Sequence, residues 1–444
     1  MFEKMDIGTI TALIVLSLFV LMLLGMPLGV ATLTVSIGTA LLNFGVPGLF
    51  LVSSNVYGIL EKYPLVAVPL FVMMASILER IGVARDLFTA MSIFAGNMRG
   101  GVAVQTTLVG VVLAAMSGVI GGEIVMLGLI ALPQMLRLGY DPKLSIGIIC
   151  ASGSLATLIP PSIVLIVYGL SAQVSISDLF VAGIAPGILL ATFYICYVLL
   201  IVRVRPHLAP LPSEVGEATG FTPEERKAII RGVILPVLVV FMVMGSIYGG
   251  IASVTEAAGI GVFGALISAA VRKRLTWDML QTSLRQTAVT VGSIIWLIMG
   301  AVSLVGIYNV IGGTRFLQDA LSGLEIAPVL VILIMMGILL VLGTFMEWVA
   351  IVFITVPIFA PVVVELGYDP VWFGILFTMN LQIYYLSPPF GPACFWLKSV
   401  APPEITLQQI FASVWPFIGL QLVGLTLVLF FPEIVLFLPR LLNG

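Results

Sequence analysis

Long apolar segments, separated by short polar joints, cover most of this chain. Segments such as 10–24 and 188–202 contain no charged side chain. A helix needs about 20 apolar residues to cross a bilayer, and inside hydrocarbon every backbone polar group must be satisfied within a helix or a closed barrel. Uninterrupted apolar runs favour helices over the alternating strands of a barrel. We therefore predict an all-α polytopic membrane protein with about eleven spanning helices.

One part of this pattern occurs twice. The sequence Leu-Gly-Tyr-Asp-Pro at 138–142 returns at 366–370, and Pro160-Pro161 returns as Pro388-Pro389 at the same separation. Single matches of leucine or alanine are expected by chance in so apolar a chain. A pentapeptide and a diproline that share one separation are not, so we interpret the two stretches as one structural unit present twice.

The two copies differ in the charge of their polar joints. Weaker matches extend the copies to 82–186 and 312–416. Between residues 80 and 143 the joints are basic, whereas the matching stretch from 307 to 370 has Arg315 as its one basic residue and several acidic ones. Cytoplasmic joints of membrane proteins are rich in Lys and Arg. The first set is therefore predicted to be cytoplasmic and the second periplasmic, which indicates an inverted repeat.

Each copy also contains an apolar stretch with a glycine-rich middle. The stretches lie at about 99–137 and 327–366, with middles at 117–123 and 343–347. Each is long enough for two spans of about 20 residues, but each could also be a re-entrant hairpin whose tip lies inside the membrane. Irregular backbone at membrane depth is tolerated where it is buried in protein or lines a cavity. We favour two re-entrant helical hairpins.

The diprolines predict two broken helices, at about 143–170 and 371–398. Proline donates no backbone hydrogen bond and clashes with the carbonyl group four residues earlier. Two in succession should unwind a turn and free carbonyl oxygens, which are ligands for a cation such as Na⁺. The hydroxyls of Thr157 and Ser387 could add to the ligands. A kink that only shapes packing is the alternative, but the pairing of each break with a glycine-rich tip favours a site.

Two acidic residues, Glu123 and Glu347, lie within the glycine-rich tips. An acidic side chain inside a membrane is a candidate functional residue by default. Each also stands where a new helix is predicted to begin, and there the helix dipole favours a negative side chain. Coordination of a ligand and a structural role both remain open.

Composition agrees with the membrane class and excludes others. The chain is 60% hydrophobic and 9% charged, whereas soluble domains carry about 25% charged residues. Its net charge of −2 gives no indication of nucleic-acid binding. The three cysteines are far apart and the single histidine, His207, lies in a polar loop. No spacing indicates a metal-binding or catalytic motif, so we predict that the protein is not an enzyme.

The predicted regions follow in chain order. They are scaffold spans at 1–81, the first copy at 82–202, a cytoplasmic loop at 203–231, scaffold spans at 232–311 and the second copy at 312–438. The N-terminus is predicted to be cytoplasmic and the C-terminus periplasmic. Short amphipathic helices are expected near Leu87 and near Trp277, and Ser253 with Glu256 forms a capping-box pattern.

These motifs together resemble a known family. Ser117-Gly118 through Leu132-Pro133, Ile159-Pro160-Pro161-Ser162 and Tyr248-Gly249-Gly250-Ile251 look like the large membrane subunit of tripartite ATP-independent periplasmic (TRAP) transporters. The resemblance implies a sodium-coupled, elevator-type importer of the ion-transporter superfamily in the bacterial inner membrane. It also implies a separate small four-span membrane subunit, a periplasmic substrate-binding protein and an organic-acid substrate.

The resemblance further implies two Na⁺ sites, each between a hairpin tip and a broken helix. The first maps to Ser117, Gly118, Gly121, Thr157 and Ile159, and the second to Gly343, Thr344, Met346, Leu386 and Ser387. Substrate is expected between the tips, with Gly122, Glu123 and Glu347 as candidate contacts. Val119-Ile120 stand where the family commonly has two serines, and Ser387 where it has threonine. Backbone ligation at the first site does not depend on those hydroxyls.

The predicted function is therefore Na⁺-coupled import of a small organic acid as the transport subunit of a binding-protein-dependent TRAP system. The alternative is a stand-alone Na⁺/anion symporter of the same superfamily, which uptake by this chain alone would establish. A passive channel would not require two matched tips and breaks.

Overall fold

The computed structural model describes residues 6–95, 98–118, 121–211, 223–323 and 326–443. In these ranges it contains α-helices, three short 3-10 helices and no strand, which confirms the all-α prediction. In chain order the elements are α1 (Ile7–Leu23), α2 (Leu28–Phe44), α3 (Gly48–Leu60), η1 (Tyr63–Val66), α4 (Ala67–Arg80), α5 (Val83–Ala95), α6 (Gly101–Ser117), α7 (Gly122–Arg137), α8 (Pro142–Ser154), η2 (Leu155–Thr157), α9 (Ile163–Ala172), α10 (Ile176–Val204), η3 (Pro206–Leu208), α11 (Pro223–Tyr248), α12 (Val254–Val271), α13 (Trp277–Val310), α14 (Gly313–Ser322), α15 (Pro328–Gly343), α16 (Trp348–Glu365), α17 (Pro370–Leu386), α18 (Pro392–Val400), α19 (Leu407–Phe430) and α20 (Glu433–Asn443).

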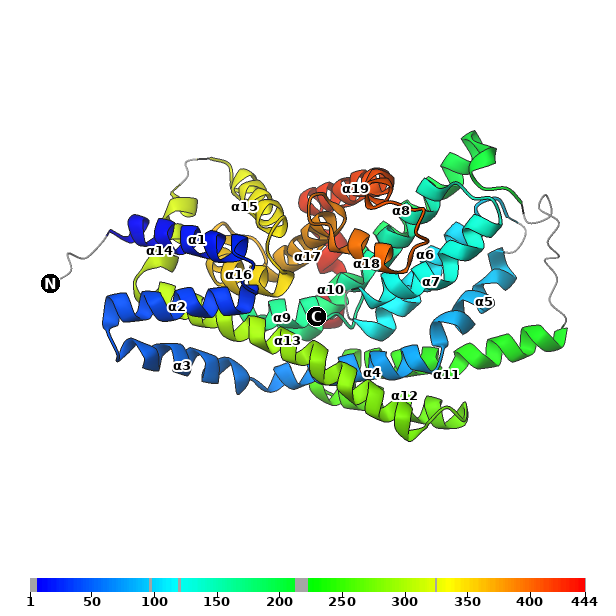
Figure 1. The fold of residues 1–444 in the computed structure, drawn as a ribbon, viewed down its shortest axis with the longest axis horizontal. Coiled ribbons are helices and arrows are strands. Elements are labelled where there is room, and N and C mark those ends of the chain that lie inside the picture. The colour runs from blue at the N-terminus through cyan, green and yellow to red at the C-terminus, as the bar shows by residue number, and fades with distance from the viewer. Residues whose placement is uncertain (1–5, 96–97, 119–120, 212–222, 324–325, 444) are drawn as a thin grey trace.

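The helices form two layers in the view of Figure 1. One layer contains α2, α3, α4, α12 and α13, and the other contains the helix pairs α6–α7 and α15–α16 with α8, α17, α18 and α19. Helix α13 runs along the first layer and packs against α2, α3 and α4, and also against α16. The long α13 therefore connects the two layers.

Two sequence-based expectations change here. The short helix expected near Trp277 is wrong as a separate element, because this residue begins the continuous 34-residue helix α13. The connection between α10 and α11 is shorter than the predicted loop at 203–231, since α11 begins at Pro223. The part of that loop at 212–222 lies outside the described residues, as do Val119 and Ile120. The predicted capping box of Ser253 and Glu256 is confirmed at the start of α12.

The repeated pentapeptide ends one helix and begins the next. After α7, Gly139 adopts a φ of 74°, and the amides of Gly139 and Tyr140 donate hydrogen bonds of 3.0 and 2.9 Å to carbonyl oxygens of the last turn. Asp141 then caps α8 by accepting a 2.9 Å bond from the amide of Leu144, and Pro142 occupies the first helical position. Glycine ends the first helix because it adopts the left-handed conformation readily. Aspartate caps the start of the next helix, and proline fixes the φ of its first residue at a helical value.

The second copy turns in the same way, except that its aspartate accepts from the amide two positions on and not three. Gly367 has a φ of 82°, and the amides of Gly367 and Tyr368 each donate a 3.0 Å bond to carbonyl oxygens of the last turn of α16. The carboxylate of Asp369 accepts a 2.7 Å bond from the amide of Val371, and Pro370 begins α17. The motif recurs because it encodes one sharp corner between two helices.

The glycine-rich middles are turns between antiparallel helices, and the diprolines interrupt helices. α6 ends at Ser117 and α7 begins at Gly122, while α15 ends at Gly343 and α16 begins at Trp348. Regular α-helix stops at Ser154 and resumes with α9, and in the second copy it stops at Leu386 and resumes with α18. The fold thus brings two helical pairs and two interrupted helices together.

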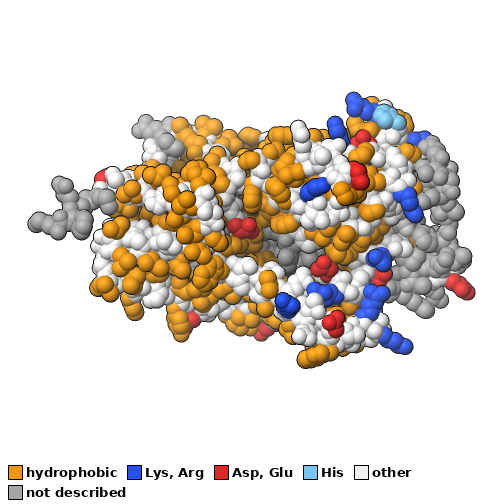
Figure 2. Space-filling model, in the orientation of Figure 1, with side chains coloured by type: hydrophobic (Ala, Val, Ile, Leu, Met, Phe, Trp, Pro, Cys, Tyr) orange, Lys and Arg blue, Asp and Glu red, His pale blue; other side chains and the backbone are white. Residues whose placement is uncertain are grey.

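The surface fits a membrane environment. Six helices within the described ranges are long and apolar enough to span a bilayer, and shorter apolar helices accompany them. Figure 2 shows hydrophobic side chains over much of the visible face, with Lys and Arg gathered toward one end of the molecule. The total of about eleven spans stays a prediction.

Candidate functional site

The first glycine-rich turn lies against the first helix break. Gly118 follows α6 with a left-handed φ of 55°. Its carbonyl oxygen accepts a 3.3 Å hydrogen bond from the amide of Ile163, and a Cβ added at Gly118 would collide with the carbonyl oxygen of Pro161. Turn and break therefore meet through backbone atoms, at a position that requires glycine.

Thr157 is held at the centre of this break. Its hydroxyl donates to the carbonyl oxygen of Ser154 at 2.9 Å and accepts from the side-chain amide of Gln382 at 2.9 Å. The hydroxyl of Ser162 donates to the carbonyl oxygen of Thr157 at 2.5 Å. Because a hydroxyl oxygen has two acceptor positions, the Gln382 contact leaves one of them for another ligand.

The first break also has unused backbone acceptors. Among the described residues, the carbonyl oxygens of residues 158–161 accept no hydrogen bond. The Pro160-Pro161 peptide bond is cis, and the side chain of Ile159 packs against Gly187 of α10. Free carbonyl oxygens are ligands that hard cations accept in proteins. The break can therefore contribute ligands without burying a charged side chain.

The second turn meets the second break through side chains. A Cβ added at Gly343 would collide with the ring of Tyr384, which lies three residues before Ser387. The hydroxyls of Thr344 and Ser387 each donate a 2.7 Å bond to a carbonyl oxygen of the preceding helical turn. A hydroxyl that donates in this way keeps lone pairs for a cation.

The second break resembles the first in its backbone. Within the described ranges the carbonyl oxygens of residues 387–390 accept no hydrogen bond, and the Pro388-Pro389 bond is cis. The carbonyl oxygen of Leu386 accepts a weak 3.7 Å bond from the thiol of Cys394. Met346, the remaining predicted member of this set, is buried at the turn after α15.

Gly121 lies against an aromatic ring of the second copy, and its predicted part in the first Na⁺ site stays a prediction. Its φ is 99°, and a Cβ added there would lie 2.8 Å from the indole ring of Trp396, on α18 of the second copy. The ring of Tyr385 lies 5.8 Å from that of Trp396, and the ring of Tyr384 lies 4.7 Å from that of Tyr385. An aromatic cluster from the second break therefore covers the tip of the first turn.

The two tip acids differ in their surroundings. Glu123 lies in the first turn of α7 and is 2% exposed. With Ser117 and Gly122 it lines a cavity whose opposite wall is formed by α4 and α13. Glu347 is the residue before α16, but its side chain does not cap that helix. The structure thus brings Glu123, and with it one face of the first tip, against the layer of long helices.

Comparisons with known proteins place the chain in one family. The family model described as "Tripartite ATP-independent periplasmic transporter, DctM component" matches residues 15–434. The C4-dicarboxylate TRAP transporter large permease protein DctM of Pseudomonas aeruginosa is 30% identical over 86% of this chain and 88% of its own length. The ectoine TRAP transporter large permease protein TeaC of Halomonas elongata is 30% identical over 97% of this chain and 99% of its own length.

Two solved structures share the fold at low sequence identity. The YdaH transporter of Alcanivorax borkumensis superposes with a TM-score of 0.62 at 16% identity, covering 95% of this chain and 97% of that one. MtrF of Neisseria gonorrhoeae, described with a class of antimetabolite efflux pumps, superposes with a TM-score of 0.61 at 14% identity. The match covers 87% of this chain and 84% of that one. This likeness concerns the arrangement of helices.

Proposed function

Because the chain belongs to the DctM component family of TRAP transporters, an inner-membrane permease family, we propose that it imports a small organic acid by Na⁺-coupled secondary transport. The relatives are transport permeases and not enzymes. Their names mention C4-dicarboxylate and ectoine, which are small carboxylate-bearing solutes. The proposed partners are a separate small membrane subunit and a periplasmic substrate-binding protein.

The observation that carries Na⁺ coupling is the pair of helix breaks with free carbonyl oxygens. Each break lies beside a turn between two helices, through Gly118 in one case and Gly343 in the other. Na⁺ prefers oxygen ligands, and unwound carbonyls in interrupted helices supply them in secondary transporters. Thr157 and Ser387 each add one hydroxyl oxygen.

Matched contacts support the repeat that the proposed inversion requires. In the first copy the hydroxyl of Ser152 on α8 donates to that of Thr107 on α6 at 3.1 Å. In the second, the amide of Asn380 on α17 donates to the carbonyl oxygen of Met336 on α15 at 2.9 Å. Each contact ties an interrupted helix to the first helix of its neighbouring pair. We propose that the two pairs are re-entrant hairpins that move with the interrupted helices against the scaffold, as an elevator.

Reconstitution tests this proposal. Proteoliposomes would contain this chain with its small membrane subunit, and the binding protein would be added outside. Radiolabelled succinate and ectoine serve as probes, while Na⁺, proton and voltage gradients are imposed one at a time. We expect uptake that requires both a Na⁺ gradient and the binding protein. Uptake that ignores Na⁺ contradicts the coupling, and uptake by this chain alone establishes a stand-alone symporter instead.

A further inference from the structure

A small cavity separates the first tip from the layer of long helices. Its volume is about 80 Å³, and its walls come from α4, α5, α6, α7 and α13. Most of its lining is apolar, but Glu79, Glu123, Ser76, Ser117, Gln286 and Thr290 also face it. This volume holds an ion with a few water molecules, since one enclosed water requires about 10–15 Å³ of such space.

Glu123 is the most deeply buried acid of this cavity. Its side chain is 2% exposed, and in the described part of the chain neither carboxylate oxygen has a hydrogen-bond partner. The hydroxyl of Ser117 is buried and likewise has no partner there. A buried carboxylate is costly unless it is paired. The cavity therefore combines a carboxyl group and a hydroxyl that lack hydrogen-bond partners among the described residues with space beside them.

The opposite wall offers further oxygen atoms. The hydroxyl of Ser76 on α4 donates to the side-chain oxygen of Gln286 on α13 at 3.2 Å, and the guanidinium group of Arg80 donates to the same oxygen at 2.7 Å. Ser76 thus keeps acceptor lone pairs that face the cavity. Glu79 supplies a second carboxylate.

We propose that this cavity is a binding site for a monovalent, Na⁺-sized cation, with Glu123 as its anionic ligand. The site rests on the proposed Na⁺ coupling and is additional to the two sites at the helix breaks. The described residues contain no group of three or more potential metal-ligating acidic, histidine or cysteine side chains. A cavity with two carboxylates and several neutral oxygens suits a monovalent ion better than the carboxylate-rich Ca²⁺ sites.

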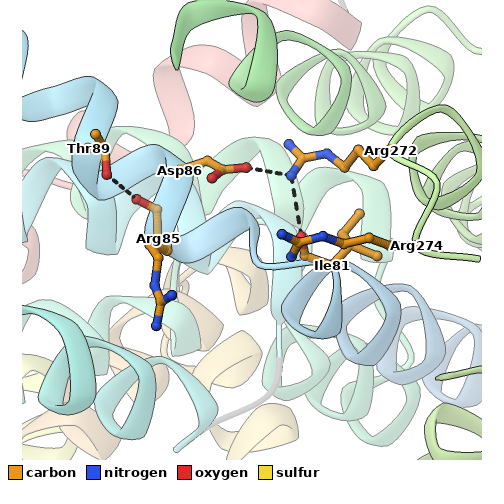
Figure 3. Close-up of polar contacts among 6 residues, drawn as sticks. All are labelled: Ile81, Arg85, Asp86, Thr89, Arg272 and Arg274. Carbon is orange, nitrogen blue, oxygen red and sulfur yellow. Dashed lines mark hydrogen bonds and ion pairs between the residues drawn. The ribbon is translucent and has the colours of Figure 1, made fainter. Parts of the chain in front are cut away.

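A second cavity lies next to this one. It measures about 320 Å³ and shares Glu79 and Met126 with the first one. Arg85, Asp86 and Arg274 also line it. Figure 3 shows Arg272 reaching Asp86, while Arg274 donates a 2.8 Å bond to the carbonyl oxygen of Ile81. Glu79 lines both cavities.

The position of the site gives it a role in the transport cycle. Its ligands come from the first tip on one side and from α4 and α13 on the other. If the tip moves relative to those helices, the two halves of the site separate. The cation therefore binds in the conformation seen here and stabilises it, because a ligand shifts an equilibrium toward the state that it binds better.

Direct binding of ²²Na⁺ tests the inference. The full chain, purified with its small subunit, is titrated with Na⁺ at fixed ionic strength with choline as the replacement and without solute. Wild type is compared with Glu123→Gln, and with Asp278→Asn as the matched control, since Asp278 is also an acid in the first turn of a helix but is exposed. We expect Glu123→Gln to lose one bound Na⁺, or to bind it at least about tenfold more weakly. Asp278→Asn should bind as wild type does.

Other variants and outcomes complete the test. Glu79→Gln should weaken the binding of the same Na⁺ to a smaller degree. This second variant keeps the test valid if Glu123→Gln folds poorly. The inference is overturned if Glu123→Gln and Glu79→Gln bind Na⁺ with the stoichiometry and affinity of wild type. Wild type that binds no Na⁺ would overturn the coupling in the proposed function as well. Unchanged binding in both variants, with normal Na⁺-driven uptake, would remove this site alone.

Discussion

The side-chain amide of Gln382 donates a 3.1 Å hydrogen bond to the carbonyl oxygen of Ser154, the residue 228 positions earlier and equivalent to it in the repeat. The same amide donates to the hydroxyl of Thr157 at 2.9 Å. Gln382 is fully buried, so these bonds form away from water. The helix that precedes the second break thus fixes the residues that precede the first.

Replacing Gln382 by leucine should loosen this connection. The change keeps a similar volume but removes both hydrogen bonds. Because the carbonyl oxygen of Ser154 keeps its bond from Thr157, we expect a loss of about 1 kcal/mol of unfolding free energy. Denaturant unfolding of the purified protein measures this loss. Gln281→Leu, at an exposed position of α13, is the control and should change stability by less than about 0.5 kcal/mol. Equal stability of both variants would show that the Gln382 bonds contribute nothing net.

Pro160→Ala and Ser387→Ala should weaken the dependence of uptake on Na⁺ without blocking membrane insertion. Alanine at 160 restores a backbone donor that competes for the freed carbonyl oxygens, and alanine at 387 removes a hydroxyl oxygen. The measurement is the Na⁺ concentration that gives half-maximal uptake in proteoliposomes, which should rise. Pro236→Ala, a proline inside α11 and away from the breaks, is the matched control. An unchanged Na⁺ response in both break variants would contradict the role of the breaks.

Gly118→Ala should damage the contact between the first turn and the first break. The added Cβ meets the carbonyl oxygen of Pro161, and the left-handed backbone costs a non-glycine residue about 1–2 kcal/mol in addition. We expect a lower melting temperature and reduced uptake. Gly337→Ala lies in the interior of α15 with open space around the new Cβ, and should be neutral or stabilising by up to about 1 kcal/mol. A Gly118→Ala protein with wild-type stability would mean that the turn can shift freely.

Asp141→Ala and Asp369→Ala should destabilise the protein by similar amounts. Each removes the cap of the helix that follows, which costs about 1 kcal/mol. Asparagine at either position should retain most of the stability, because its side-chain oxygen can accept the same hydrogen bond. Unfolding midpoints of the four variants provide the comparison. A large loss in one copy and none in the other would show that the two corners are not equivalent in energy.

The sequence was a good guide wherever structure depends on near neighbours. The ends of α7 and α16 follow from one glycine each, the starts of α8 and α17 from one aspartate each, and the interruptions from the diprolines. The polar residues near Trp277 led to the wrong prediction of a separate helix. Helix α13 is about 51 Å long at 1.5 Å per residue, so it extends beyond a bilayer core of about 30 Å. Its polar first turns therefore do not need a helix of their own.

Contacts between the copies could not be derived in the same way. Gly121 meets Trp396, and Thr157 meets Gln382, across more than 200 residues of chain. Neither partner belongs to a motif with a fixed spacing. The one available signal was an amide in an apolar helix, at the repeat position of Ser154, since a buried amide needs a hydrogen-bond partner.

The corner formed by Leu-Gly-Tyr-Asp-Pro makes most of its hydrogen bonds with the two helices that it joins, and in the first copy the amide of Asp141 also donates to the carbonyl oxygen of Leu208. The shape of the corner therefore depends more on these two helices than on the residues that surround it. The tips and breaks on either side differ in sequence between the two stretches, whereas the pentapeptide and its turn recur. A corner whose shape is set mainly by its own five residues and the two adjoining helices allows residues elsewhere in one half of the protein to change without a matching change in the other half.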